Sequence, residues 1–254
     1  KNLVIILVIF AFLWYYRFTF LILLGGEFMD FNSSDAIRTM DTNSVLTNTF
    51  FRMFLGLLAS AVTAVYAYYS GMWETMVING TFYGLAIAEV VVVILFSLFF
   101  TKVSPTVVTI MYFGYAFLNG FTLSVIFAAY ELTSIGYAFA ATSAMFGILS
   151  YIGYKTDKDL SNWSTVLSVT LIVGLILTIV NLFVGSTMLD IILDWAMLFL
   201  FFGLTVYDMN KIREMHDAGF CDDEKLYVYG AMELYLDFIN IFLRILALFG
   251  KRRD

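Results

Sequence analysis

Residues 164–185 read STVLSVTLIVGLILTIVNLFVG, a run of 22 residues without a charged side chain. The hydrocarbon core of a bilayer is about 30 Å thick, so about 20 apolar residues in a helix are enough to cross it. A helix also satisfies all of its backbone polar groups internally, which lipid demands of a spanning segment. This stretch therefore predicts a transmembrane helix, and its length is the measure by which the rest of the chain can be divided.

Apolar segments of similar length occur on both sides of this stretch. After Asn48, polar interruptions divide the chain into seven of them: 50–69, 81–101, 106–129, 134–154, 164–185, 191–210 and 227–249. No segment alternates as a transmembrane β-strand does, and most connections are only a few residues long. We therefore expect an all-α polytopic membrane protein, with seven antiparallel transmembrane helices within residues 29–254.

The composition agrees with a membrane protein and excludes several other classes. Hydrophobic residues make up 61% of the chain and charged residues 13%, and the mean hydropathy is +0.89. A net charge of −6 without a dense Lys/Arg run argues against nucleic acid as a partner. The single cysteine, Cys221, and the single histidine, His216, leave no disulfide framework and no zinc motif. No phosphate-binding loop or nucleophile elbow is present either, so the sequence predicts no cofactor.

Basic residues predict the orientation, because Lys and Arg in short loops stay on the cytoplasmic side. They precede or begin the first span, or lie around the second, fourth and sixth connections: Arg38, Arg52, Lys102, Lys155, Lys158, Lys211, Arg213 and Lys225. The other connections hold acidic residues and no basic one, so Asn48 is expected in the cytoplasm. With seven spans, residues 251–253 would then lie outside, against the rule. A re-entrant last segment that returns to the cytoplasm is the alternative.

The first 28 residues permit three interpretations. Residues 3–24 are apolar enough to span, but Arg17 near their middle costs roughly 2.5–3.5 kcal/mol on insertion scales. A signal peptide needs a small-residue cleavage site, and none follows Leu24. Residues 25–29, Gly-Gly-Glu-Phe-Met, can be encoded by a purine-rich ribosome-binding run before an ATG codon. Our hypothesis is that Met29 is the native start and residues 1–28 are a translated leader. Native peptides from before Met29 would exclude it.

Ionisable residues inside the expected spans are unfavourable wherever they face lipid. They are Glu89, Asp194, Asp208, Glu233, Asp237 and Arg244. Asp237 lies about ten residues into the last segment, or about 15 Å along its axis, which is close to the middle of the membrane. Glu233 and Asp237 are four residues apart and share a helix face, so we expect one of them to be protonated or paired. Each acid can instead fix helix register by hydrogen bonding, the interpretation that we favour for Asp194.

Carboxyl groups are the candidates for a proton sensor within the spans, because His216 lies in a polar connection. Two carboxyl groups close together in a low-dielectric site do not both ionise at little cost, so they share one proton over a broad pH range. Such a pair is a switch. Its oxygens are also the hard ligands that Ca²⁺ prefers, although they carry too little charge and rigidity for tight storage.

A series of short motifs runs through the chain in a specific order and spacing. They are Ser104-Pro105-Thr106 through Tyr112, Asn119-Gly120, Thr122-Leu123-Ser124, Met145-Phe146-Gly147, Lys158-Asp159-Leu160, Phe202-Gly203-Leu204-Thr205 with Tyr207-Asp208, Gly230-Ala231, and Leu234-Tyr235-Leu236-Asp237-Phe238-Ile239-Asn240. With these motifs, the chain from about Met29 to Gly250 resembles the Bax inhibitor-1 (transmembrane Bax-inhibitor-motif) family. Its short form is similar to the bacterial branch.

The resemblance implies a fold, an activity and a location. It implies that the last of seven helices is central and surrounded by the other six, and that the protein is a pH-sensitive calcium leak channel, here in a bacterial cytoplasmic membrane. The aspartate pair that gates the path in this family corresponds to Asp208 and Asp237. This pair would bind Ca²⁺ transiently, close the path when protonated and open it when deprotonated. Glu89 and Glu233 would add oxygen ligands along the ion path.

Further polar residues receive roles from the family pattern or from their own chemistry. The family has a basic latch in its second helix, but residues 89–100 contain no Arg or Lys, so only Lys102 could serve. Arg244 is expected to pair with an acidic group or with the outer headgroups. Asn119 and Asn240 are expected to form hydrogen bonds between helices, and the glycines of the third and fourth spans to allow close packing.

Other functions stay open at this point. Two intramembrane aspartates with a Tyr207-Asp208 dipeptide resemble an intramembrane aspartyl protease. However, Asp237 follows Leu-Tyr-Leu rather than Gly-x-Gly, and the single proline, Pro105, leaves no Pro-Ala-Leu motif. A retinal-type pump needs a lysine that the last span lacks. A non-conducting modulator of unidentified partner membrane proteins is compatible with the sequence. We expect a channel and not an enzyme.

Overall fold

The computed structural model describes residues 42–158 and 160–253. The expected leader, with Arg17 and Met29, and the basic residue Arg38 lie outside the described residues. Within this part the chain is all-α apart from one isolated β-bridge, between Tyr130 and Arg252. The helices are α2 (Thr42–Tyr69), α3 (Met72–Ile78), α4 (Thr81–Phe99), α5 (Pro105–Ala129), α6 (Leu132–Lys155), α7 (Ser161–Val184), α8 (Thr187–Asp217) and α9 (Asp223–Phe249).

Each expected span corresponds to one long helix. In the described ranges, six helices are long and apolar enough to cross a membrane, namely α2, α4, α5, α6, α7 and α8. An all-α polytopic membrane protein is therefore confirmed. The seventh expected segment forms α9, which is helical but is not among these six.

The largest differences from the expectation are at two helix boundaries and in one connection. Helix α2 begins at Thr42 rather than at residue 50, and α8 continues to Asp217 rather than ending at 210. The expected segments end at the first polar residues, because hydropathy defines only the part of a helix inside the hydrocarbon. The helix itself can continue beyond the hydrocarbon into water. The first connection contains the short helix α3, which begins after Gly71 and is followed by Gly80. Both glycines have φ near +73° (74° and 72°), a left-handed conformation that glycine adopts readily.

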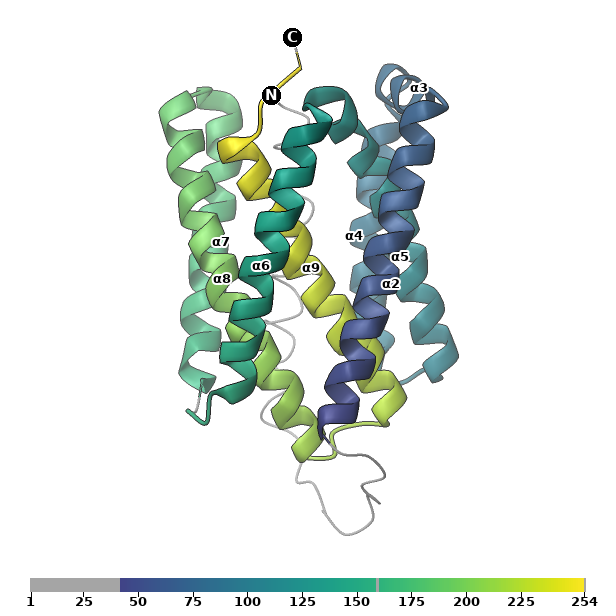
Figure 1. Ribbon diagram of the computed structural model, residues 1–254, viewed down its shortest axis with the longest axis vertical. Helices are drawn as coiled ribbons and strands as arrows, with labels where there is room; N and C mark the ends of the chain where they lie inside the picture. Colours follow the sequence, from purple (N-terminus) through teal and green to yellow (C-terminus); the bar gives the residue numbers. More distant parts are fainter. Residues whose placement is uncertain (1–41, 159, 254) are drawn as a thin grey trace.

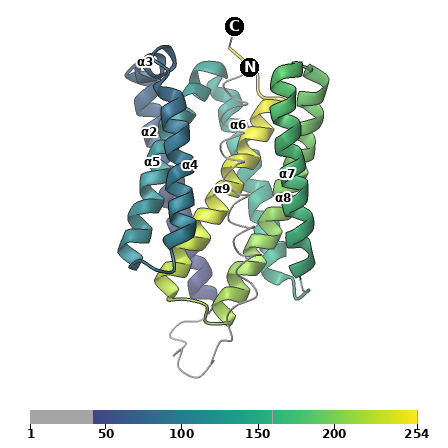
Figure 2. The ribbon, with the colours of Figure 1, turned by 180° about the vertical axis from the view of Figure 1, so that it is seen from behind.

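Helix α9 runs obliquely through the bundle, between α2 and α6 in one view and in front of α6 in the opposite one (Figures 1 and 2). It packs against α2, α5, α6 and α8. Helix α4 packs on α5, and α7 packs on α8, so these two lie farther from α9. Every residue of α9 from Leu226 to Leu246 is buried. The ionisable residues in this stretch are therefore enclosed by protein.

The C-terminal residues lie at the end of the bundle opposite the start of α2 (Figure 1). They are attached to the connection between α5 and α6. The Glu131 amide donates to the Lys251 carbonyl at 3.0 Å, and the Arg253 amide donates to the Ala129 carbonyl at 3.0 Å. Helix α9 therefore passes from one end of the bundle to the other.

The expectation that glycines allow close helix packing holds for only part of the set. A Cβ atom on Gly120 would lie 2.6 Å from Cβ of Thr63, and one on Gly153 would lie 2.4 Å from the Val206 carbonyl oxygen. At Gly114, Gly136 and Gly147 no atom of the described residues would come within 4 Å of an added Cβ atom, so the expectation is wrong there. Sequence does not tell which way a helix is rotated, and rotation decides which glycines meet a neighbour.

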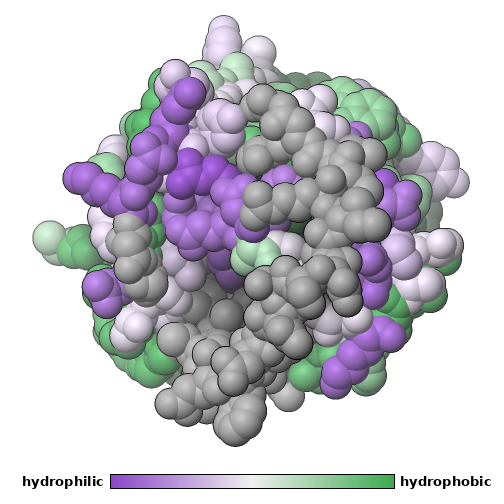
Figure 3. Space-filling model, turned by 90° about the horizontal axis from the view of Figure 1, so that it is seen from below, coloured by the Kyte–Doolittle hydropathy of each residue, from purple (hydrophilic) through white to green (hydrophobic). Residues whose placement is uncertain are grey.

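The surface of the bundle is polar at one end and apolar at its sides. Seen from the end where α8 is joined to α9, hydrophilic residues gather on the end face, and hydrophobic residues follow the rim (Figure 3). On α7, Val166, Ile176 and Phe183 are exposed. A bilayer requires this distribution, because the sides contact hydrocarbon and the ends contact headgroups and water.

Candidate functional site

Three acidic side chains of α8 and α9 meet inside the bundle. Asp208 of α8 and Glu233 and Asp237 of α9 are 2%, 5% and 0% exposed. The Asp237 carboxyl group interacts electrostatically with Asp208 and Glu233, and Glu233 interacts with Asp208. We call these three residues the acid cluster. The two aspartates that the sequence singles out thus lie next to each other, together with a third carboxyl group.

Helix geometry explains why these side chains meet. Glu233 and Asp237 are one turn apart and project from the same face of α9, which packs along α8. Gly230, one turn before Glu233, brings neighbouring helices close to α9. A Cβ atom on Gly230 would lie 2.9 Å from Cγ2 of Thr49 and 3.0 Å from Cδ1 of Ile212. This close packing of α2 and α8 on α9 helps to exclude solvent from the acid cluster.

Asp237 is the residue of the acid cluster with the most unusual surroundings. Neither of its carboxyl oxygens accepts a hydrogen bond from a donor group of the described residues, and its polar neighbours are Thr205 and the Asp208 carboxyl group. Thr205 lies beside it, but the Thr205 hydroxyl donates to the Phe201 carbonyl of its own helix at 2.8 Å. A buried carboxylate without hydrogen bonds is strongly unfavourable. Burial of Asp237 is therefore favoured in two ways. Either a proton converts the side chain to the neutral acid, or a cation binds the carboxylate.

Lys211 and Tyr229 lie at the edge of the acid cluster. The sequence had assigned neither residue to a functional site. Both Lys211 and Tyr229 interact with Glu233. The Lys211 ammonium group is 5.9 Å from the ring centroid of Tyr207 and 5.7 Å from that of Tyr229. The spacing in the sequence could have indicated that Lys211 lies near the acid cluster. Lys211 follows Asp208 by three residues, so the two side chains are neighbours on the surface of α8.

Glu89 of α4 belongs to a second buried polar network. It accepts hydrogen bonds from the Thr122 hydroxyl at 2.7 Å and from the Asn119 amide at 3.4 Å. Asn119 accepts one from the Tyr235 hydroxyl at 2.9 Å, and that hydroxyl is 2.7 Å from the Ser60 hydroxyl. The network joins α2, α4, α5 and α9. Tyr235 is two residues from both acids of α9, so the network lies on the other side of this helix. The sequence places Thr122 and Tyr235 in family motifs, but it assigns no role to them or to Ser60, because isolated hydroxyls give no pattern.

The other predicted residues lie away from the acid cluster. Buried Arg244 donates to Asp194 at 2.5 Å, so it has an acidic partner in α8. Lys102 is exposed, and its ammonium group lies 5.9 Å from the Phe99 ring centroid. Asn119 forms hydrogen bonds between helices, as described above. The Asn240 amide instead donates to the Leu236 carbonyl of its own helix at 2.9 Å.

The connection between α8 and α9 carries Cys221, and His216 lies near the end of α8. Burial, and to a smaller extent the charge of Asp222, raises the pKa of the Cys221 thiol to about 12, so this thiol stays protonated near neutral pH. Nδ1 of His216 is 3.5 Å from the Asp223 carboxylate. In the described part of the chain, no group of three or more His, Cys, Asp and Glu residues is arranged to hold a metal ion.

Together, the fold and the acid cluster define an all-α integral membrane protein that encloses ionisable groups between its helices. A family model described as inhibitor of apoptosis-promoting Bax1 matches residues 42–254. The chain therefore belongs to the Bax inhibitor-1 family, and the resemblance seen in its motifs is confirmed.

Bacterial relatives match most of the chain. The inner membrane protein YbhL of Escherichia coli (strain K12) is 38% identical over 207 residues, which cover 79% of this chain and 88% of YbhL. An uncharacterized protein of Deinococcus radiodurans is 34% identical over 222 residues, covering 85% of this chain and 94% of the relative. An uncharacterized membrane protein of Streptococcus pyogenes serotype M3 is 37% identical over 172 residues, covering 67% and 74%.

Proposed function

We propose that this protein is a pH-sensitive calcium leak channel of a bacterial cytoplasmic membrane, with Asp208 and Asp237 as its gate. The observation that carries the proposal is the environment of Asp237, which is fully buried, accepts no hydrogen bond from a described donor group and adjoins two other acids. The charge of such a group depends strongly on bound protons and cations. Membership of the Bax inhibitor-1 family supports the same activity.

The proposed mechanism follows from charge in a low-dielectric site. At low pH the acid cluster is protonated, a hydrogen bond joins Asp208 to Asp237, and α8 and α9 stay packed together. Loss of protons places like charges side by side, and their repulsion separates the two helices. The negative charge then admits Ca²⁺ as cargo, with Glu233 and Glu89 as further oxygen ligands along the path. Calcium flux therefore rises with pH.

In this proposal α9 is the seventh span and is central, with α2, α5, α6 and α8 packed against it and α4 and α7 farther out. Its continuous burial from Leu226 to Leu246 supports a central position, and its course from one end of the bundle to the other supports a complete crossing. The end where α2 begins faces the cytoplasm, because the basic residues of the α4–α5, α6–α7 and α8–α9 connections gather there. The aspartate pair has no catalytic role.

Calcium flux in proteoliposomes tests the proposal. The purified full chain is reconstituted around a calcium-sensitive dye, and flux is measured from about pH 5 to about pH 8. Flux is expected to rise with pH, and Asp208→Asn and Asp237→Asn are each expected to abolish that dependence. Asp217→Asn, which changes an exposed acid of the same helix α8, is the matched control and is expected to keep the normal pH profile.

Two outcomes would support other functions. A folded protein that conducts no calcium at any pH would contradict the channel and favour a non-conducting modulator of membrane partners. Cleavage of a membrane substrate that is lost in Asp237→Asn would instead favour an intramembrane aspartyl protease.

A further inference from the structure

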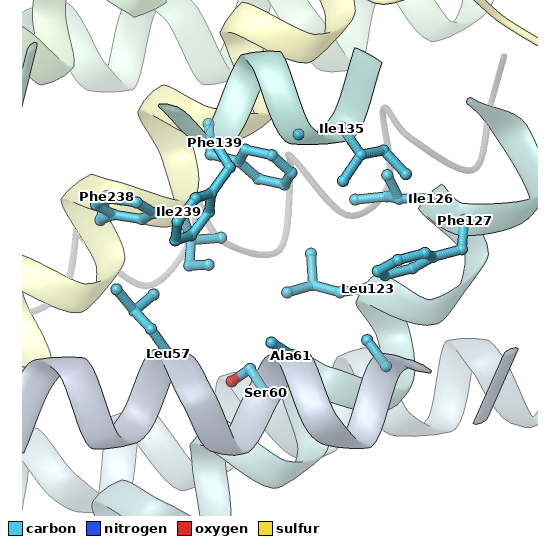
Figure 4. A pocket seen from close by; sticks show the side chains of 13 residues that line it. Leu57, Ser60, Ala61, Leu123, Ile126, Phe127, Ile135, Phe139, Phe238 and Ile239 are labelled. Atoms are coloured by element: carbon cyan, nitrogen blue, oxygen red, sulfur yellow. The ribbon is translucent and has the colours of Figure 1, made fainter. Parts of the chain in front are cut away.

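An apolar groove lies on the side of the bundle between α2 and α6 (Figure 4). The two helices approach each other through the rings of Phe50 and Phe146, whose centroids are 6.4 Å apart. The groove lies nearer the α5–α6 connection, where α5 and α9 contribute its other lining residues. We call this feature the α2–α6 groove. Its volume is about 320 Å³.

The α2–α6 groove offers hydrocarbon surface and no free polar group. Ser60 is the only residue among those lining it that has a polar side chain. Its hydroxyl is already 2.7 Å from the Ala116 carbonyl and 2.7 Å from the Tyr235 hydroxyl. A water molecule in a cavity needs two to four polar partners, and an apolar cavity of about 150 Å³ stays dry and binds benzene. A groove of this kind is therefore suited to a hydrocarbon ligand.

The position of the α2–α6 groove identifies the hydrocarbon that meets it. Its walls α2, α5 and α6 are three of the helices that can cross a membrane. Ala61 and Phe139, on opposite walls, are also exposed on the side of the bundle. The opening is thus continuous with the surface that contacts lipid. At Gly136, on the α6 rim, an added Cβ atom would have no atom of residues 42–158 or 160–253 within 4 Å.

We propose that the α2–α6 groove binds one acyl chain of a membrane lipid, inserted between α2 and α6 and packed on Phe238, Ile239 and Phe242 of α9. Lipid tails are about as apolar as leucine, so binding here depends on shape and van der Waals packing rather than on exclusion of water. The rings of Phe238 and Phe242 already pack edge-on against Phe139, with centroids 5.4 Å and 6.5 Å away. An inserted chain would extend this apolar contact from α6 to α2.

Photo-crosslinking with a defined lipid tests this site. The full chain is reconstituted in phosphatidylcholine that carries a diazirine within one acyl chain, and the labelled residues are mapped by mass spectrometry. Labelling of residues 238–242 is expected to exceed that of the exposed α7 residues Val166 and Val173 about threefold or more. Gly136→Phe and Ala61→Phe fill the groove from opposite walls, and each is expected to lower the labelling of residues 238–242 about fivefold.

Gly147→Phe is the matched control. Gly147 lies on the same face of α6, eleven residues or about three turns from Gly136, also has no atom within 4 Å, and is outside the groove. Its labelling pattern is expected to be normal. Labelling that is no denser in the groove than on α7 would overturn the proposal, as would normal labelling of residues 238–242 in a folded groove-filling variant. Cross-links from the groove to a second copy of the chain would assign it to a protein interface instead.

Discussion

At the residue scale, the two buried ionic sites of α8 and α9 differ in whether the carboxylate has a partner. The carboxyl oxygens of Asp237 accept no hydrogen bond from a donor group within the described ranges, whereas Asp194 binds the guanidinium group of Arg244. Removing one member of a buried ion pair leaves an uncompensated charge, but removing an unsatisfied group relieves a cost. The same substitution should therefore have opposite effects at the two positions.

Asp237→Asn is expected to keep or raise the stability of the protein in detergent at neutral pH, by up to about 2 kcal/mol, because the amide cannot ionise and so places no charge in the buried site beside two other acids. Asp194→Asn is expected to lower it by about 2–3 kcal/mol, because buried Arg244 loses its partner. Thermal and denaturant unfolding curves measure both effects. A larger loss for Asp237→Asn than for Asp194→Asn would mean that Asp237 has a structural partner.

If the protein is the proposed channel, Lys211 should affect the pH at which calcium flux rises. Its ammonium group interacts with Glu233 and favours the ionised acid cluster. Lys211→Met should therefore make proton loss harder and move the pH midpoint of calcium flux upward by about half a unit to one unit. Lys102→Met, at an exposed position above Phe99, is the control. A shift with Lys102→Met alone would place the basic latch of the family at Lys102.

At the element scale, apolar length predicts where helices lie, but not how they face each other. The stretch 164–185 and its neighbours predict each long helix, because lipid leaves no other local structure for such segments. The ends of α2 and α8 are missed, since polar residues continue these helices beyond the apolar part. Helix α3 is missed because it is too short for a span.

The candidate site could be predicted only in part. Acidic residues in apolar helices are conspicuous, so Asp208, Asp237 and Glu233 are found from sequence, and helix spacing places the last two on one face. The partner of Arg244, the network around Glu89 and the proximity of Lys211 all depend on the relative rotation of helices distant in sequence. A single sequence contains no direct record of that rotation.

Glycines show the same dependence on rotation and lead to a stability prediction for α5. A Cβ atom at Gly120 would lie 2.6 Å from Cβ of Thr63 and 2.7 Å from the Ser60 carbonyl oxygen, so Gly120→Ala should force α2 and α5 apart and cost about 1–3 kcal/mol. Gly114→Ala, in open space on the same helix, should instead add up to about 1 kcal/mol through helix propensity. Unfolding curves of the two variants separate these effects. A neutral Gly120→Ala would contradict the close contact of α2 and α5.

At the scale of the whole molecule, the basic C-terminus lies at the end of the bundle that has few other cations. Local contacts hold its charges in place. Nζ of Lys251 is 2.5 Å from the Glu131 carboxylate, the Arg252 guanidinium lies 5.9 Å from the ring centroid of Tyr130, and Arg253 donates to the Tyr68 hydroxyl. The basic residues at the other end outnumber these three, so the charge rule still favours a cytoplasmic start of α2.

Cysteine accessibility tests this topology. In a Cys221→Ser background, single cysteines replace Ser70 and Arg252 at one end of the bundle and Thr101 and Asp157 at the other, all at exposed positions. In intact bacterial cells, a membrane-impermeant maleimide is expected to label the first two cysteines and to reach the second two only after permeabilisation. If Arg252→Cys instead reacted together with Thr101→Cys, then α9 would not cross the membrane. The buried acids of α9 would then belong to a segment that enters and leaves by the same side, and a path along this helix would not connect the two compartments.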